Sequence, residues 1–201
     1  MSDETSQRER AVPTDRPTPR ITADLLRDIG LFGGLDDASL GVLARQLEAS
    51  HAESGEVIVE EGGTRREMYV VVGGELEVVK RGPRGGLFRV ALFGPGDWFG
   101  EMSILDVQPR SATVRAVAPT MLVKITTEDV ETLLYRRDVK AYALFVMNIA
   151  RELSRRLRVA DGILAQFVST VADTYTPGGE RPRDEDDCWA VGCVAAELVT
   201  G

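Results

Sequence analysis

The sequence has few of the residues on which enzymes and metal sites usually depend. It contains one histidine, His51, and two cysteines, Cys188 and Cys193. The histidine lies in a polar stretch with no context for a nucleophile, so we expect a surface residue rather than a general base. The cysteines have no histidine or further cysteine nearby, so neither a metal site nor a disulfide framework is predicted. We therefore expect no metal and no enzymatic activity.

Long apolar runs are also missing. No stretch approaches the roughly 20 apolar residues that a membrane span needs, and residues 1–20 contain no apolar segment of the kind found in secretory signals. That segment is rich in Thr, Pro, Arg, Asp and Glu and predicts a disordered arm. The net charge of −8 disfavours nucleic acid as a partner. We expect a cytoplasmic protein that binds neither membrane nor nucleic acid.

Two short runs carry the chemistry of the chain. The first is Phe-Gly-Glu-Met-Ser at 99–103, and the second is Pro-Arg-Ser-Ala-Thr at 109–113. Gly100 lets the backbone approach a ligand closely. The carboxylate of Glu101 can accept from a sugar hydroxyl, and the planar guanidinium of Arg110 suits two oxygens of a phosphate. The two runs together predict a site for an anionic sugar phosphate.

These runs resemble the phosphate-binding cassette of the cyclic nucleotide-binding domain family. That family includes catabolite-activator-type bacterial regulators, the regulatory subunits of cyclic-AMP-dependent kinase and nucleotide-gated channels. The resemblance covers roughly residues 25–171. Besides the cassette, it rests on LFGGLDDASL at 31–40, GEVIVEEG at 55–62 and MYVVVGGELEVV at 68–79.

The resemblance implies cyclic AMP or cyclic GMP as the ligand. It assigns the ribose hydroxyl to Glu101, the cyclic phosphate to Arg110, and contacts through backbone amides and a hydroxyl to Ser111 and Ala112. The complete set of ligand-binding residues that we predict is Phe99, Gly100, Glu101, Met102, Ser103, Arg110, Ser111, Ala112 and Asp161.

The identity of the base stays open. Residues 155–161 resemble the region where bacterial regulators place hydroxyls against adenine, but Ala160 and Asp161 stand there instead. Asp161 could accept a hydrogen bond from an adenine amino group or from guanine. A solvated charge is the favoured interpretation of this carboxylate. Ser111 is compatible with either purine.

The pattern of the chain predicts a fold that is mainly β with flanking helices, a double-stranded β-helix (jelly-roll, cupin-like) barrel followed by a long C-terminal helix. Helical spacing predicts helices at 22–29 and 37–48, before the barrel, and from Thr126–Thr127 to about Arg136, after it. Short β-branched runs separated by glycine turns predict strands at 57–59, 68–72, 76–79, 88–93, 113–117 and 121–125.

A long apolar stripe follows the barrel. Apolar residues recur at intervals of three and four on a helix of roughly eight turns, namely Tyr142, Val146, Ile149, Leu153, Leu157, Ala160, Leu164, Phe167 and Val171. A small barrel cannot cover so long a stripe. We therefore favour a homodimer through helix 138–172 over a helix folded back on its own barrel.

Three segments are expected: a disordered arm at 1–20, a cyclic nucleotide-binding domain at 21–172 (β-roll 55–126, helices 127–172), and an acidic linker with a short apolar helix at 173–201. The last segment is too short for a winged helix-turn-helix. Residues 187–201 resemble a buried helix of protein kinases, without any of the catalytic motifs. A kinase remnant, a docking helix and coincidence remain as interpretations, and a remnant would make the chain a fragment.

The function we predict is a cyclic nucleotide sensor that signals through its C-terminal helix to an unknown protein effector. The alternative is a degenerate domain that binds no nucleotide and serves dimerisation or docking, with Glu101 and Arg110 as a structural ion pair. A catabolite-activator-like transcription regulator is disfavoured by charge and by length.

Overall fold

A computed structural model describes residues 20–106 and 108–175 of the chain. The chain divides into two compact units, one up to Glu152 and one from Leu153 onward, and each is described by itself. The first unit contains all the described strands and the short helices. The predicted arm at 1–20, apart from its last residue, and the tail from 176 with Cys188, Cys193 and the kinase-like helix lie outside the described residues.

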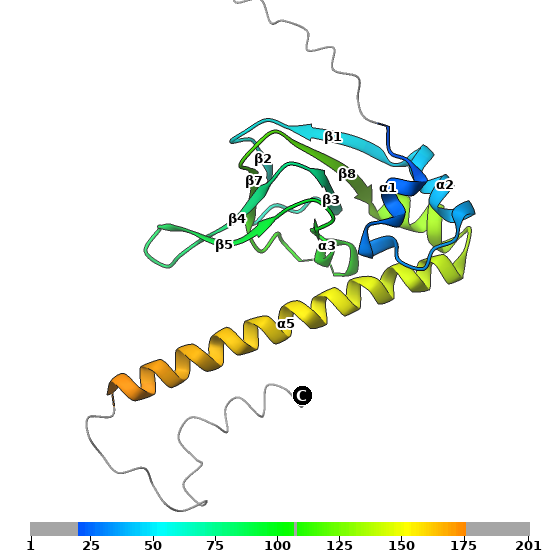
Figure 1. Ribbon diagram of the computed structural model, residues 1–201. Coiled ribbons are helices and arrows are strands. Elements are labelled where there is room, and N and C mark those ends of the chain that lie inside the picture. Colours follow the sequence, from blue (N-terminus) through cyan, green and yellow to red (C-terminus); the bar gives the residue numbers. More distant parts are fainter. Residues whose placement is uncertain (1–19, 107, 176–201) are drawn as a thin grey trace, which may run out of the picture. The chain divides into compact units, whose positions relative to one another are not determined.

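The first unit is built on two four-stranded antiparallel sheets (Figure 1). In one sheet the strand order is β1-β8-β3-β6, and in the other it is β2-β7-β4-β5. The strands are β1 Glu48–Ala52, β2 Val57–Val59, β3 Glu67–Gly73, β4 Leu76–Arg81, β5 Leu87–Phe93, β6 Trp98–Phe99, β7 Thr113–Ala116 and β8 Thr120–Thr126.

The core of the roll lies between the two sheets. Side chains alternate across each strand, so every second residue points inward. Tyr69, Val71 and Leu122 come from one sheet, and Leu76 and Val114 from the other, into one buried cluster. This arrangement confirms the predicted fold class, a β-roll with flanking helices.

The strands expected from the sequence are confirmed within one or two residues, but β1 and β6 were missed. The sequence of β1 is Glu-Ala-Ser-His-Ala, of which only Ala52 is buried, so it carries no apolar alternation. Its neighbour β8 defines it instead, since Glu48 pairs in register with Lys124 and also forms an ion pair with it. The predicted helix at 37–48 was two residues too long, because α2 ends at Gln46 and Glu48 already belongs to β1.

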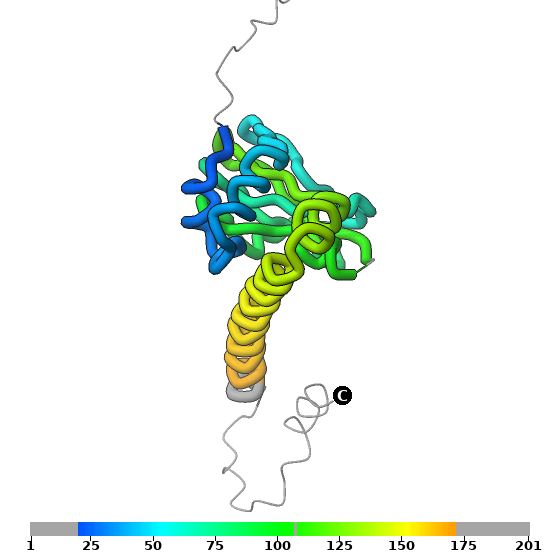
Figure 2. The backbone as a smooth tube through the Cα atoms, turned by 90° about the vertical axis from the view of Figure 1, so that its right-hand side faces the viewer, coloured from blue at the N-terminus to red at the C-terminus, as the bar shows by residue number. Residues whose placement is uncertain are grey.

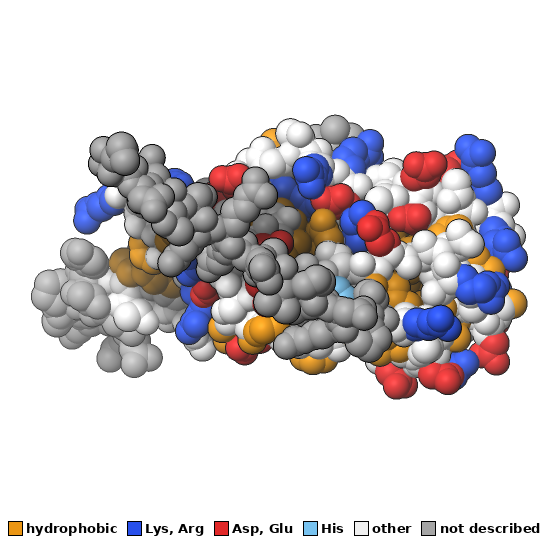
Figure 3. Space-filling model, turned by 90° about the horizontal axis from the view of Figure 1, so that it is seen from above, with side chains coloured by type: hydrophobic (Ala, Val, Ile, Leu, Met, Phe, Trp, Pro, Cys, Tyr) orange, Lys and Arg blue, Asp and Glu red, His pale blue; other side chains and the backbone are white. Residues whose placement is uncertain are grey.

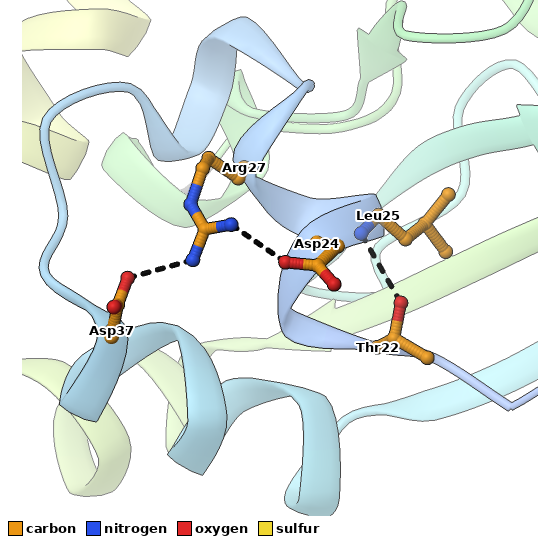
Figure 4. Close-up of polar contacts among 5 residues, drawn as sticks. All are labelled: Thr22, Asp24, Leu25, Arg27 and Asp37. Carbon is orange, nitrogen blue, oxygen red and sulfur yellow. Dashed lines mark hydrogen bonds and ion pairs between the residues drawn. The ribbon is translucent and has the colours of Figure 1, made fainter.

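Helices α1 (Ala23–Arg27), η1 (Gly30–Phe32, a 3-10 turn) and α2 (Asp37–Gln46) precede the roll. Thr22 caps α1 by accepting from the amide of Leu25 at 3.2 Å. The guanidinium of Arg27 donates to Asp24 at 2.6 Å and to Asp37 at 2.7 Å, and so links α1 to the start of α2 (Figure 4). Exposed pairs of this kind contribute little free energy of folding, so burial of the apolar side chains holds the helices in place.

Past the roll come α4 (Thr127–Asp129), the π-helical η2 (Val130–Tyr135) and α5 (Val139–Tyr175). Thr126 and Asp129 form a reciprocal capping box, which confirms the predicted helix start. The first turns of α5 lie beside the N-terminal helices (Figure 2). There the rings of Phe145 and Phe32 are 6.3 Å apart. The long C-terminal helix is therefore also confirmed, three residues longer than the predicted end at 172.

The second unit contains the rest of α5. Large apolar side chains on it are exposed, among them Ile163 (63%), Leu164 (60%) and Phe167 (65%). Two of these three belong to the predicted stripe. No helix in the described part of the chain is both long enough and apolar enough to cross a membrane. The dimer through this helix stays a prediction.

Candidate functional site

The two runs singled out in the sequence meet at one place in the first unit. The first run leaves β6 at Phe99, turns at Gly100 and enters the short helix α3 (Met102–Leu105). Gly100 has φ +83°, a conformation that side chains disfavour. A Cβ at this position would lie 2.6 Å from Nη1 of Arg110 and 2.9 Å from the carbonyl oxygen of Glu67. The Arg110 guanidinium therefore occupies the space that a side chain at position 100 would need.

The backbone of Arg110 is held by the turn between β2 and β3. The amide of Gly62 donates to the Arg110 carbonyl at 2.8 Å, and the Arg110 amide donates to the Gly63 carbonyl at 2.8 Å. The Glu61 amide also donates to the hydroxyl of Thr113 at 3.0 Å. The second run is therefore fixed as it enters β7.

The guanidinium of Arg110 is bound by groups from the first run and from β3. Nη1 donates to the hydroxyl oxygen of Ser103 at 3.0 Å and to the Gly100 carbonyl at 3.4 Å. Nη2 donates to the Glu67 carbonyl at 2.5 Å. Arg110 is only 8% exposed, and its Nε is buried without a hydrogen-bond partner in the part of the chain that the structure describes. A buried donor in this state is uncommon in proteins and calls for an explanation.

One buried carboxylate and one half-buried carboxylate act on the charge of this arginine, namely Glu101 and Glu67. Burial lowers the pKa of the Arg110 guanidinium, against the opposing effects of Glu67, Tyr69 and Glu101. Glu101 is only 4% exposed, so its carboxylate is buried. The Tyr69 hydroxyl donates to the Glu67 carboxylate at 2.8 Å, and burial followed by that bond raises the pKa of Tyr69. Arginine stays charged under such shifts, so the site holds a desolvated cation close to carboxylates.

Besides Glu101 and Arg110, six of the predicted ligand residues belong to the same region of the first unit. Their environments differ. Gly100 and the buried Ser103 contact Arg110. Phe99 packs in the core, with its ring stacked on Tyr69 at 5.3 Å and on Phe93 at 5.7 Å. The other three are Met102, which is 54% exposed, Ser111, which is exposed, and Ala112, which is half-buried against the core.

Asp161 is the one predicted ligand residue in the second unit. It lies on α5 and is exposed. Its role toward a base stays a prediction.

Sequence reasoning missed the residues that support the arginine from β3 and from the turn before it. Glu67 acts through its carbonyl, and Gly62 and Gly63 act through the backbone, so no side-chain pattern identifies them. Arg66 adds a contact from its Nε to the Ser103 carbonyl at 3.4 Å. The Gly62-Gly63 pair predicts a turn, but only the fold shows what that turn holds.

Other site chemistries find little support in the described residues. Among them, no group of three or more His, Cys, Asp or Glu side chains could hold a metal ion. Acidic and basic side chains are interspersed over the described part of the face drawn in Figure 3, which offers no extended basic surface there. What the region can do chemically is neutralise a compact anion with Arg110 and accept from a hydroxyl with Glu101.

Part of the chain is similar to a known family of domains. Residues 49–137 match the family model described as "Cyclic nucleotide-binding domain". A CRP-like cAMP-activated global transcriptional regulator of Mycobacterium tuberculosis is 26% identical over 147 residues, which cover 73% of this chain and 63% of that protein. The cyclic AMP receptor protein of Thermus thermophilus is 34% identical over 131 residues, covering 65% of this chain and 58% of the relative.

The fold is shared with solved structures of the same kind. A cyclic nucleotide-binding domain from Methylobacillus flagellatus KT superposes with a TM-score of 0.64 at 26% identity, covering 72% of this chain and 82% of that one. The chain spans about 60% of the length of the two curated relatives. The similarity therefore concerns a domain, and the activities of the whole relatives are not transferred with it.

Proposed function

We propose that this chain, whose residues 49–137 match the cyclic nucleotide-binding domain family, binds cyclic AMP or cyclic GMP at Arg110 and Glu101 and acts as a regulatory domain. In this proposal the guanidinium of Arg110 pairs with the cyclic phosphate, and the carboxylate of Glu101 accepts from the ribose hydroxyl. No catalytic step is assigned to the chain.

The observation that carries the proposal is the buried Arg110 with an Nε that has no hydrogen-bond partner in the described part of the chain. Burying a cation and leaving one of its donors unsatisfied costs free energy of folding. A fold tolerates that cost where function requires it, and a phosphate oxygen is the acceptor that an arginine donor suits best. The glycine beside it, Gly100, adds the close backbone approach that such a ligand needs.

We further propose that ligand binding is reported through α5 to a second copy or to another protein. The helix continues from the first unit, where Phe145 and Ile149 are buried, into the second unit. A ligand can shift an equilibrium only by binding two states with different affinity. The first turns of α5 are bonded to the N-terminal segment through Asn148 and are part of the unit that holds the cassette.

The test is calorimetric titration of the purified chain with cyclic AMP and with cyclic GMP. We expect saturable binding with a Kd near the micromolar range, which corresponds to a binding free energy of about −8 kcal/mol. The two Kd values rank the two bases. Arg110→Ala should abolish the heat. Arg84→Ala, which removes an exposed arginine of the β4–β5 turn, is the matched control and should bind like the parent.

Thermal unfolding separates loss of binding from loss of fold. A ligand at 100 times its Kd stabilises the native state by about 2.7 kcal/mol, so the parent and Arg84→Ala should show a rise in melting temperature with nucleotide. If the folded parent gives no heat and no shift with either nucleotide, the proposal is wrong, and a degenerate docking domain becomes the working account.

A further inference from the structure

We propose that Ser103 is a positioning residue for the phosphate-binding arginine, holding the Arg110 guanidinium in place before ligand arrives. This inference rests on the proposed function of the site and adds a residue to it. The hydroxyl oxygen of Ser103 accepts from Nη1 of Arg110 at 3.0 Å, and this bond is buried. Ser103 is 6% exposed and Arg110 is 8% exposed, so both partners of this bond are buried.

The hydroxyl of Ser103 is itself oriented by the backbone. Its oxygen lies 2.7 Å from the Gly100 carbonyl and 3.2 Å from the Glu67 carbonyl, to which it can donate. A hydroxyl has one hydrogen and can also accept. Since both neighbouring carbonyls can only accept, the proton of Ser103 is directed toward them and its lone pairs toward the arginine.

The same two carbonyls also bind the arginine directly. Nη1 donates to Gly100 at 3.4 Å and Nη2 to Glu67 at 2.5 Å. The guanidinium, the hydroxyl and two carbonyls thus form one closed network. Within it Ser103 is the only side chain that an identified hydrogen bond connects to Arg110 in the described part of the chain. A side chain is also the one member of the network that a substitution can remove cleanly.

A held guanidinium binds an anion better than a mobile one. Arginine carries large rotamer entropy, and immobilising it at the moment of binding reduces affinity. Because the network already immobilises the Arg110 side chain when the protein folds, that entropy is not lost again when the ligand binds. Because the bond to Ser103 uses Nη1, it leaves Nε outside the network, which is the donor without a partner in the described residues.

A purely structural role for Ser103 is the competing interpretation. The residue lies in the first turn of α3, and its amide donates to the Gly100 carbonyl at 3.1 Å. A hydroxyl at such a position can serve the turn alone. The two interpretations differ in one respect: a positioning role depends on Arg110, and a turn role does not.

A double-mutant cycle with cyclic AMP and cyclic GMP tests this dependence. Ser103→Ala should weaken nucleotide binding about tenfold, the size expected for a bond to a charged group. Ser103→Thr, which keeps the hydroxyl, should restore affinity to within about threefold of the parent. In an Arg110→Lys background, Ser103→Ala should change the Kd by less than about twofold, because the bond it removes is already gone.

Nitrogen-15 NMR of the guanidinium gives a readout without ligand. We expect slow rotation of the Arg110 side chain in the parent and in Ser103→Thr, and faster rotation in Ser103→Ala. Thr132→Ala, which removes an exposed hydroxyl bonded to the Glu128 carbonyl, is the stability control.

The outcomes separate the two levels of the argument. If the parent binds neither nucleotide, the proposed function fails and the positioning role falls with it. If the parent binds but Ser103→Ala binds equally well, or loses the same factor in the Arg110→Lys background, only the positioning role is overturned. Unchanged guanidinium rotation in Ser103→Ala would also overturn it.

Discussion

A Cβ atom added to Gly100 would stand 2.6 Å from Nη1 of Arg110, although the two residues are ten positions apart in the chain. The same added atom would lie 2.9 Å from the Glu67 carbonyl and 3.2 Å from Cα of Met68, and neither of these backbone atoms can move aside. The glycine and the arginine therefore define one another's position, and the site depends on the absence of a side chain as much as on the presence of one.

We predict that Gly100→Ala weakens nucleotide binding by at least tenfold and destabilises the fold by more than about 1 kcal/mol. Two effects add: alanine is strained at φ +83°, and its methyl group must displace the Arg110 guanidinium. Calorimetric titration and urea unfolding measure the two losses.

Gly55→Ala is the matched control for that prediction. Gly55 has φ +85°, nearly the same as Gly100, but nothing lies within 4 Å of the added Cβ. It should show the backbone strain, about 1 kcal/mol, and bind nucleotide like the parent. Equal loss of affinity in both variants would show that the contact with Arg110 is irrelevant to binding.

We predict that Asn148 contributes to the stability of the first unit. Its Nδ2 donates to the carbonyls of Leu31 at 3.0 Å and Gly33 at 2.9 Å, joining α5 to the N-terminal segment, and it is 7% exposed. Asn148→Ala leaves two carbonyls without this donor. Unsatisfied buried groups cost about 1 to 3 kcal/mol each, so we expect a loss of about 2 to 4 kcal/mol in the free energy of unfolding.

Urea unfolding of Asn148→Ala and Thr132→Ala, side by side, checks this expectation. Thr132→Ala removes one exposed hydroxyl bond and should change the free energy of unfolding by no more than about 0.5 kcal/mol. A loss of similar size in the two variants would contradict the idea that Asn148 is a principal tie between the segments.

The N-cap of α2 predicts a dependence of stability on pH. Asp36 accepts from the amide of Ser39 at 2.8 Å, and this backbone bond is the main reason that its pKa is lowered from 3.8. A lowered pKa in the folded state means that Asp36 stabilises the fold above its unfolded pKa. That contribution is lost as the pH falls through the folded pKa.

Asp36→Asn keeps an oxygen for the cap but does not titrate. We therefore expect the parent to lose more free energy of unfolding than Asp36→Asn when the pH is lowered from about 5 to about 2.5. All other carboxylates are common to the two proteins, so their contributions cancel in the comparison. Parallel losses across this range would show that the cap does not couple to protonation.

The sequence was informative wherever chemistry or periodicity was local. Arg110 and Glu101 lie within ten residues and could be found from residue type and spacing. Six strands were marked by short β-branched runs between turn residues, and the capping pair Thr126 and Asp129 is visible in four consecutive residues. Long-range backbone partners were invisible. The Glu67 carbonyl reaches Arg110 from 43 positions away, and every residue type has a carbonyl.

Strands β1 and β6 were missed for a related reason. A polar or very short strand is specified by its neighbour's unpaired backbone groups rather than by its own side chains. In β1 the partner is β8 over five residue pairs, and in β6 it is β3 over two. Similarly, the tie from Asn148 to Leu31 spans 117 positions, and a lone asparagine on an amphipathic helix gives no signal of its partner.

The apolar stripe of α5 is exposed in the second unit. Leu164 and Phe167 belong to the stripe expected from the sequence and are 60% and 65% exposed in the second unit. Burial of apolar area yields roughly 25 cal/mol per Å², and a second copy of this helix can supply the matching surface. We expect the parent to be a dimer in sedimentation equilibrium over a concentration series.

Phe167→Asp should shift that dimer strongly toward monomer, because it would place a charge in the apolar seam. Ser169→Asp is the matched control. At 100° per residue it lies about 160° around the helix from Phe167, and its exposed hydroxyl bonds only within the helix, to the Gln166 carbonyl at 3.0 Å. This variant should keep the parent's association constant. A parent that stays monomeric at every concentration, or equal weakening in the two variants, would contradict a homodimer through this stripe.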